Sequence, residues 1–406
     1  MIGRVTGRAI EHKRRLIGLG SLPRASDLMS PWSVVNVSVY PFGGGWWPFN
    51  PSVHLDPVDG VWRCLVRCAN YTLPDGVPHL SPDARVGRAQ TRNVLLELDP
   101  ETLVPVSVAE LRDPLALPVA PSCTSRGLED LRLFRTASDG LVAVGCALQH
   151  NLERPNRPET VLCRLDGRRR SRSGVVGIGM EISSVKPIRG PWDFRPQKNW
   201  APFDGTDEIR LLYSIERGVV MTEHGPAPGS PPPVMNKSHA PASRQVRSIG
   251  RISAEVRLFG RPVAVIEPQH ALLEKRDELR GGSQLVQLAD GRWLGVAHEM
   301  TFSRAGKSKF YWHTFYTLDQ GGGLLERSPP MRLSGDHGIE FAAGLAIDQS
   351  GRLAVSYGTD DHEAWIATTT LSSVMAILEA VPKPVPVDSP GFGAVQVDAA
   401  GEGGTR

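Results

Sequence analysis

The sequence predicts an all-β fold, and most simply a five-bladed β-propeller. The 406 residues include 42 glycines and 34 prolines, which suits many short strands joined by turns. Strand-like runs recur along most of the chain, whereas helical periodicity is weak over any long window. The hairpins gather into groups at intervals of about 50–60 residues, as the blades of a propeller would. A pair of packed sheets in a β-sandwich is the alternative.

The composition excludes several classes of protein. A hydrophobic content of 40% is enough to build a core, so a disordered chain is excluded. The 46 basic and 43 acidic residues are too evenly balanced to indicate a nucleic-acid surface. No apolar run approaches the roughly 20 residues of a membrane span.

Cysteine usage and the N-terminus point to the same compartment. The five cysteines have no Cys-x-x-Cys spacing, so free thiols are expected rather than disulfides or a zinc ribbon. Residues 1–19 are basic but lack the apolar core of a signal peptide. We therefore expect a cytoplasmic protein.

Three regions follow from the patterning. Residues 1–30 form a leader that is partly helical or loose, residues 31–375 the propeller, and residues 376–406 a disordered tail rich in Pro, Gly and Ala. The proline-rich stretch 223–243 cannot be a central strand and is expected to be a surface insertion or a lid.

The expected strands are bounded by turn signals such as the Asp-Gly pair at 290–291. They run over residues 61–67, 93–98, 141–148, 160–165, 208–215, 218–222, 284–288, 293–298, 309–318, 345–347, 353–357 and 363–371. We group them into blades around residues 50–100, 127–170, 180–222, 280–320 and 340–372.

The segment 126–134, Arg-Gly-Leu-Glu-Asp-Leu-Arg-Leu-Phe, carries the strongest chemical signal. Glu129 and Asp130 lie between two arginines where a strand opens. Neighbours in a strand point to opposite faces, so only one of the two carboxylates is expected to face the axis. Arg132 shares a face with Asp130 and could hold substrate or tune its titration. A turn with surface ion pairs explains the pattern equally well.

Further candidates lie at strand ends, where the innermost strands of a propeller deliver side chains to the axis. Polar residues at such ends indicate a ligand, and Lys198-Asn199-Trp200 combines the cation, amide and aromatic ring that sugar sites use. The alternative is a Trp200 that packs between blades. The substrate-binding candidates are Asn50, Arg67, Asn70, Glu129, Arg132, Lys198, Asn199, Trp200, His298, Glu299, Glu340, Tyr357, Asp361 and Glu363.

The acidic cluster at 360–363 could in principle ligate a metal. It lacks the spacing of a known metal motif, so a capped turn is the better interpretation. No metal is expected.

Together these segments resemble the five-bladed propellers related to glycoside hydrolase family 130, a group with mannoside phosphorylases, β-mannoside hydrolases and mannosyltransferases. The resemblance spans residues 49–371. Its motifs here are FNPSV, GLEDLRLF, KNWAPF, GGSQ, a strand ending in His-Glu, GIEFAAGLA and SYGTDDHEAWIA. Leu131 stands where the family has proline in its Glu-Asp-Pro-Arg motif, which marks a divergent branch.

The resemblance implies roles for several residues. Asp130 would be the catalytic general acid, Arg132 would contact phosphate or sugar, and Arg67 and Lys198 would match basic positions. No cofactor is implied, only inorganic phosphate or a sugar donor as co-substrate. A phosphorylase needs one acid, whereas an inverting hydrolase needs a second carboxylate roughly 6.5–9.5 Å away. Glu299, Glu340 and Glu363 are its candidates.

The leading hypothesis is a glycoside phosphorylase or hydrolase acting on a β-linked, mannoside-like glycan. A glycosyltransferase of the same fold that builds a glycan is the second hypothesis, and a non-catalytic glycan-binding propeller is the third.

Overall fold

The computed structural model describes residues 22–72, 79–82, 89–112, 125–147, 158–172, 175–188, 199–216, 218–228, 255–258, 261–264, 279–302, 309–334 and 339–381. Almost all the regular structure in these ranges is β-strand. None of the helices found there has the length and hydropathy needed to cross a membrane.

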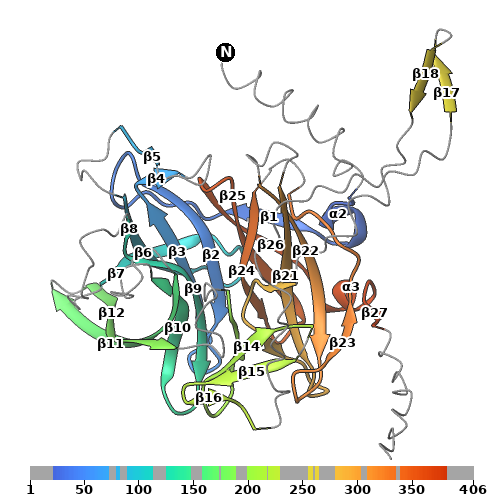
Figure 1. Ribbon diagram of the computed structural model, residues 1–406. Helices are drawn as coiled ribbons and strands as arrows, with labels where there is room; N and C mark the ends of the chain where they lie inside the picture. The colour runs from blue at the N-terminus through green and yellow to red at the C-terminus, as the bar shows by residue number, and fades with distance from the viewer. Residues whose placement is uncertain are drawn as a thin grey trace, which may run out of the picture.

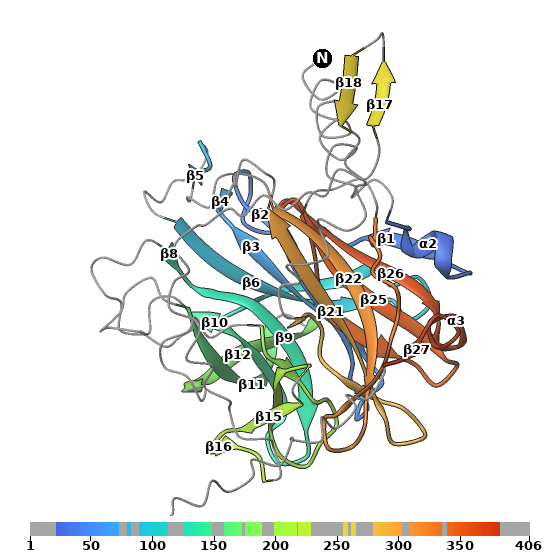
Figure 2. The same ribbon diagram turned by 45° about the vertical axis from the view of Figure 1, so that its right-hand side comes forward.

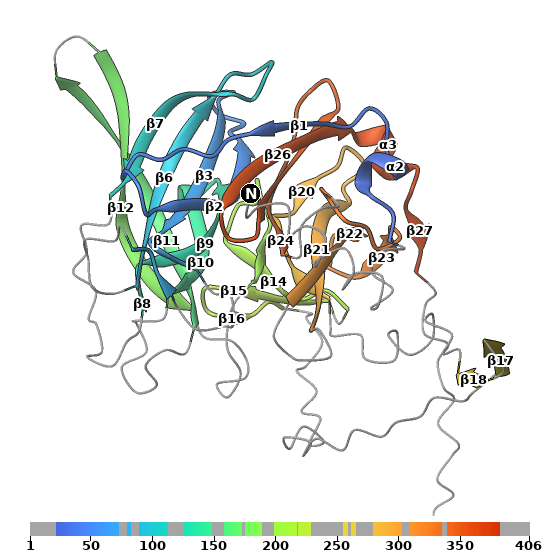
Figure 3. The same ribbon diagram turned by 90° about the horizontal axis from the view of Figure 1, so that it is seen from above.

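Five sheets follow one another along the described chain and surround a common centre (Figures 1 and 3). Apart from one short parallel pair in the first blade, neighbouring strands within each blade are antiparallel, as expected for chains that reverse through short turns. The predicted five-bladed β-propeller is confirmed.

The first two blades are complete four-stranded sheets. Blade I consists of β2 (Trp47–Leu55), β3 (Trp62–Ala69), β6 (Ala89–Leu98) and β7 (Pro105–Leu111), with the short β8 (Ser125–Arg126) parallel to β6. Blade II consists of β9 (Leu128–Thr136), β10 (Gly140–Ala147), β11 (Glu159–Arg172) and β12 (Val175–Ile188).

The remaining three blades have shorter inner or outer strands. Blade III consists of β13 (Ala201–Pro202), β14 (Arg210–Ser214), β15 (Val219–Thr222) and β16 (Gly225–Pro226). Blade IV consists of β19 (Arg280–Gly281), β20 (Val286–Gln287), β21 (Trp293–Phe302), β22 (Lys309–Leu318), β23 (Leu324–Arg327) and β27 (Glu379–Ala380). Blade V consists of β24 (Glu340–Ile347), β25 (Arg352–Thr359), β26 (Glu363–Thr370) and β1 (Ser33–Asn36).

Two small ribbons lie outside the blades. They pair β4 (Tyr71–Thr72) with β5 (His79–Leu80) and β17 (Glu255–Leu258) with β18 (Arg261–Ala264).

One predicted blade boundary is wrong. Residues 180–188 belong to β12, the outer strand of blade II, and not to the start of blade III. These residues pair with β11 in a long hairpin, in which Ile188 lies opposite Thr160. Within the proline-rich stretch, Gly225–Pro226 forms the edge strand β16, and residues 229–243 lie outside the described ranges.

The two ends of the described chain complete the last blades. β1 pairs with β26, so blade V combines its inner strands with one strand from near the N-terminus. The helices α2 (Ala25–Leu28) and α3 (Leu371–Met375) lie beside this blade (Figure 2). Ala25, Met29 and Val374 pack into the same apolar cluster. Of the expected tail, β27 pairs with β23, and residues 382–406 lie outside the described ranges.

Apolar clusters fill the spaces between neighbouring sheets. One joins side chains of blades II and III, including Phe134, Leu162 and Leu211, and another joins blades III and IV. Four buried cysteines, Cys64, Cys68, Cys146 and Cys163, are free thiols among these side chains, and Cys123 lies outside the described ranges. Burial raises the pKa of the Cys68 thiol to about 12, so it remains protonated.

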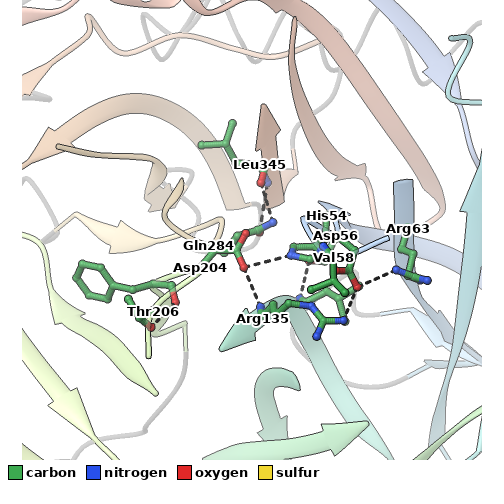
Figure 4. A network of polar contacts seen from close by, with 12 residues as sticks. His54, Asp56, Val58, Arg63, Arg135, Asp204, Thr206, Gln284 and Leu345 are labelled. Carbon is green, nitrogen blue, oxygen red and sulfur yellow. Dashed lines mark hydrogen bonds and ion pairs between the residues drawn. The ribbon is translucent and has the colours of Figure 1, made fainter. Parts of the chain in front are cut away.

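A buried polar network ties the innermost strands together near the axis (Figure 4). Gln284 Nε2 donates to the carbonyls of Val53 and Leu345, at 2.7 Å each, and the Leu345 amide donates back to Gln284 Oε1. Asp204 Oδ1 accepts from the Arg135 amide at 2.7 Å and contacts His54 Nε2 at 3.1 Å. Gln284 of blade IV therefore links blades I and V, and Asp204, which follows β13 of blade III, links blades I and II.

We expect Gln284→Leu to lower the free energy of unfolding by about 2–4 kcal/mol. The leucine would fill the space but leave buried carbonyl and amide groups of blades I and V without their partner, at ~1–3 kcal/mol each. Denaturant unfolding measures the change. Gln349→Leu, at an exposed turn, is the control and should stay within about 0.5 kcal/mol. Equal stability of the two variants would contradict the axial role of Gln284.

Candidate functional site

Asn50 and Asp130 occupy equivalent bulges on the innermost strands of blades I and II. The pairing of β2 with β3 shifts register between Phe49 and Ser52, and that of β9 with β10 shifts between Val144 and Cys146. Both residues have positive φ, 49° for Asn50 and 51° for Asp130. Asn and Asp tolerate this left-handed conformation better than other residues with a Cβ. The Asn50 bulge lies within β2 and does not interrupt the strand.

The two bulges bring their side chains into contact. Asn50 Nδ2 donates a 2.8 Å hydrogen bond to Asp130 Oδ1, although the residues are 80 positions apart. Asp130 is 7% exposed. It lies among the innermost strands and not on the outer rim, where surface ion pairs would have placed it.

Arg67 of β3 is the cation of this cluster. Its Nη1 donates to Asp130 Oδ1 at 2.8 Å, and its Nη2 lies 3.1 Å from Glu129 Oε1. Its guanidinium also lies 4.8 Å from the ring centre of Phe49. Burial alone would lower the pKa of Arg67, but the charges of Glu129 and Asp130 raise it well above its usual value. Arg67 is therefore a permanent cation.

The expectation that Glu129 and Asp130 point to opposite faces of their strand is wrong. Both carboxylates reach the same guanidinium. Asp130 and Leu131 together stand opposite Gly145, so the bulge breaks the alternation of side chains on which that expectation rested.

Arg132 is buried against three blades. Its Nε donates to the Gly282 carbonyl, its Nη1 to the Asp130 carbonyl at 3.1 Å, and its Nη2 to Asn199 Oδ1 at 3.2 Å. The side chain is 1% exposed, and burial lowers its pKa against the opposing charge of Asp130. Within the described part of the chain, no carboxylate forms an ion pair with Arg132.

Aromatic side chains continue the cluster toward blades IV and V. The Arg132 guanidinium lies 5.5 Å from the ring centre of Phe341. Phe341 in turn lies 5.0 Å from the His298 ring and 6.4 Å from the Tyr311 ring. Glu299 follows His298 on β21 and is 9% exposed. Aromatic faces beside charged groups are the surfaces that bind sugars.

Three predicted site residues are taken up by packing or hydrogen bonds within the fold. Trp200 is 2% exposed and packs edge-on against Tyr213 at 5.2 Å in the core between blades II and III, as the packing alternative expected. Asn70 is fully buried, and its Oδ1 accepts the Gln90 amide at 2.7 Å. Tyr357 lies in the apolar cluster of blades IV and V.

The acidic candidates of blade V have local partners. Glu340 is fully buried, and its carboxylate accepts from the amides of Leu333 and Ser334 at 2.7 and 3.1 Å. Glu363 Oε2 accepts from the indole of Trp365 at 3.2 Å. Asp361 lies in the β25–β26 turn with φ 56°. No group of three metal-binding side chains converges in the described ranges.

Lys198 lies outside the described ranges, but its neighbour Asn199 has φ 65° and contacts Arg132. The structure therefore brings together Asn50, Arg67, Glu129, Asp130, Arg132 and Asn199, with His298 linked to them through Phe341. Glu299 is the next residue after His298 on β21.

Two site residues were missed from sequence. Tyr71 OH donates to Glu129 Oε1 at 2.7 Å and accepts from Arg67 Nη2 at 2.7 Å. Phe341 connects Arg132 with His298. The four-residue spacing of Arg67 and Tyr71 hides their contact, because Tyr71 belongs to the separate ribbon strand β4.

No protein-family model matches this sequence, and no curated protein matches it either. Among solved structures, β-1,2-mannobiose phosphorylase from Listeria innocua is similar over 83% of this chain and 94% of its own, with 14% identity and a TM-score of 0.46. A mannose phosphorylase from Leishmania mexicana, in complex with a phosphate ion, is similar over 93% and 98%, with 12% identity and a TM-score of 0.44. A GDP-Man-dependent mannosyltransferase from the same organism is similar over 89% and 94%, with 11% identity and a TM-score of 0.42.

The similarity to mannoside phosphorylases, mannosyltransferases and related propeller glycoside hydrolases that the motifs predicted is confirmed, at low sequence identity.

We expect Gly145→Ala to destabilise the Asp130 bulge. A Cβ at Gly145 would lie 2.5 Å from the Glu129 carbonyl and 2.8 Å from the Leu131 side chain, so the bulge would have to shift, at about 1–3 kcal/mol. Thermal unfolding measures the loss. Gly167→Ala, in a strand with open space around the added methyl, should change little. If the two variants melt alike, the bulge does not depend on Gly145.

Proposed function

We propose that this protein cleaves a β-linked, mannoside-like glycan by phosphorolysis, with Asp130 as the general acid. The observation that carries the proposal is the buried Arg132 guanidinium, which forms no ion pair within the described ranges and bonds the main-chain carbonyl of Asp130. Buried charges in proteins are normally paired. A phosphate bound beside Arg132 would supply the missing negative charge at the residue that protonates the leaving group.

In the proposed reaction, a phosphate oxygen attacks the anomeric carbon and forms the new carbon–oxygen bond. The glycosidic bond breaks, and the departing oxygen takes the proton of Asp130. Asp130 is left as a carboxylate, which Asn50 and Arg67 stabilise through the bonds seen in the structure. Phosphate would replace the 3.2 Å contact between Arg132 and Asn199, and Lys198 is proposed to contribute a second cation.

The surroundings of the other carboxylates favour phosphorolysis over hydrolysis. Hydrolysis with inversion needs a second carboxylate to activate water. Glu340 is held by the Leu333 and Ser334 amides, and Glu363 by Trp365. Glu299 remains the candidate base for the hydrolytic alternative.

Incubation with manno-oligosaccharides and inorganic phosphate should release a sugar 1-phosphate. Cleavage that proceeds equally without phosphate would assign hydrolysis, and Glu299→Gln would then test the base. Synthesis from a nucleotide sugar without phosphorolysis would assign a transferase, and binding without turnover would assign a non-catalytic glycan-binding protein. Each of these three results contradicts the proposal.

Asp130→Asn should reduce release of the sugar 1-phosphate by about 10²–10⁴-fold, the usual contribution of a general acid. Asp290→Asn, in the exposed turn between β20 and β21, is the matched control and should retain full activity. Normal turnover by Asp130→Asn would remove Asp130 from the mechanism.

A further inference from the structure

Arg67, Glu129, Asp130 and Tyr71 form a buried cluster in which one cation meets two carboxylates. Nη1 of Arg67 bonds Asp130, whereas Nη2 meets Glu129 and the Tyr71 hydroxyl. Tyr71 OH is itself a donor to Glu129 at 2.7 Å. Arg67 and Tyr71 are 5% and 3% exposed, so water screens these charges little. The two ends of the guanidinium thus serve different carboxylates.

The two carboxylates of the cluster have different hydrogen-bond partners and different roles in the proposed reaction. Burial, together with Glu129, raises the pKa of Tyr71, with Arg67 opposing, so Tyr71 stays a protonated donor. Glu129 Oε1 therefore receives the Tyr71 proton in a hydrogen bond and also lies beside Arg67 Nη2. Asp130, by contrast, must carry a proton before it can give one to a leaving group. With Glu129 ionised and Asp130 protonated, the charges of the Arg67–Glu129–Asp130 cluster sum to zero.

We propose that Glu129, fixed by Tyr71, is the counter-charge of Arg67 and a positioning residue that lets Asp130 hold its catalytic proton. Without the Glu129 charge, Arg67 would act on Asp130 alone and keep it ionised, because a nearby opposite charge favours the ionised form. The inference rests on the proposed general-acid role of Asp130. It gives Glu129 and Arg67 a role other than substrate binding.

Among the described residues, the other groups that face Asp130 do not change when Glu129 is replaced. From β2 comes the neutral amide of Asn50. From β9 itself comes the Arg132 charge, which bonds the main-chain carbonyl of Asp130, attracts its carboxylate, and is the same in wild type and in the Glu129 variants. From β24, which packs against β9, comes Glu340, whose carboxylate is turned to the Leu333 and Ser334 amides.

The test is the pH dependence of phosphorolysis in Glu129→Gln and Glu129→Asp. Activity falls as the pH rises through the midpoint at which the acid loses its proton. In Glu129→Gln the uncompensated Arg67 charge should move this alkaline midpoint down by about 1 pH unit or more, with activity recovered at lower pH. Glu129→Asp keeps the charge and should stay closer to the wild-type midpoint.

Glu110→Gln, in the surface ion pair with Arg92, is the matched control and should leave the profile unmoved. If Glu129→Gln and Glu129→Asp both lower the rate at every pH with the wild-type midpoint, Glu129 is only structural and the inference is overturned. Should Glu129→Gln fail to fold, Tyr71→Phe carries the test, because it frees Glu129 and should move the midpoint in the same direction by less. An unmoved midpoint in Tyr71→Phe would then overturn the inference.

A measurement without turnover separates this inference from the proposed function. Carbon-13 NMR of labelled aspartate carboxyls, with Asp130→Asn to assign the signal, follows the titration of Asp130 directly. The signal should titrate at lower pH in Glu129→Gln than in wild type. An equal midpoint overturns the role of Glu129, whereas absence of phosphorolysis in wild type overturns only the proposed reaction.

Discussion

The close approach of the innermost strands around the axis is the constraint on which the rest of this structure depends. A Cβ placed at Gly344 of β24 would lie 2.2 Å from the Val53 amide nitrogen of β2, and one at Gly281 of β19 would lie 2.6 Å from the carbonyl oxygen of Asn199, which precedes β13. Backbones this close leave room only for hydrogen. Packing at the centre of the propeller is therefore between main chains, and the apolar side chains fill the spaces between the sheets farther out.

This crowding creates a problem of hydrogen bonding that the side chains solve. Strands of different blades meet in isolated main-chain bridges, such as Phe203 with Leu285, and not in ladders, so further amides and carbonyls need side-chain partners. Ser52 Oγ accepts the Leu133 amide, and Ser356 Oγ accepts the Val53 amide, both at 2.9 Å. Gln284 likewise donates to the Leu345 carbonyl, and Asp204 accepts from the Arg135 amide (Figure 4). The polar residues near the axis thus hold the blades together even where they play no chemical role.

The candidate site also depends on the innermost strands. Bulges at Asn50 and Asp130 release these residues from the alternation of their strands and turn them toward each other across two blades. The two arginines then differ in their surroundings. Arg67 is neutralised by carboxylates on both sides, whereas Arg132 is bound by carbonyl and amide oxygens. In the proposed reaction, the Arg67 end of the cluster would hold the proton donor and the Arg132 end would bind the anion.

Local chemistry along the chain was enough to predict the all-β class, the hairpins and the segment around Asp130, because alternation and turn residues act between near neighbours. The same reasoning failed where distant strands decide. It placed Glu129 and Asp130 on opposite faces, it assigned residues 180–188 to the wrong blade, and it gave no hint that β1 completes blade V.

The role of each candidate side chain was likewise a matter for the tertiary structure. Trp200 and Glu340 have the residue types of a sugar site, yet packing against Tyr213 and the bonds from the Leu333 and Ser334 amides occupy them. The polar residues of the site come from distant parts of the chain. Asp130 bonds Arg67, 63 positions away, and Asn50, 80 positions away. Those contacts exist only once the blades have closed around the axis, and no pattern among sequence neighbours encodes them.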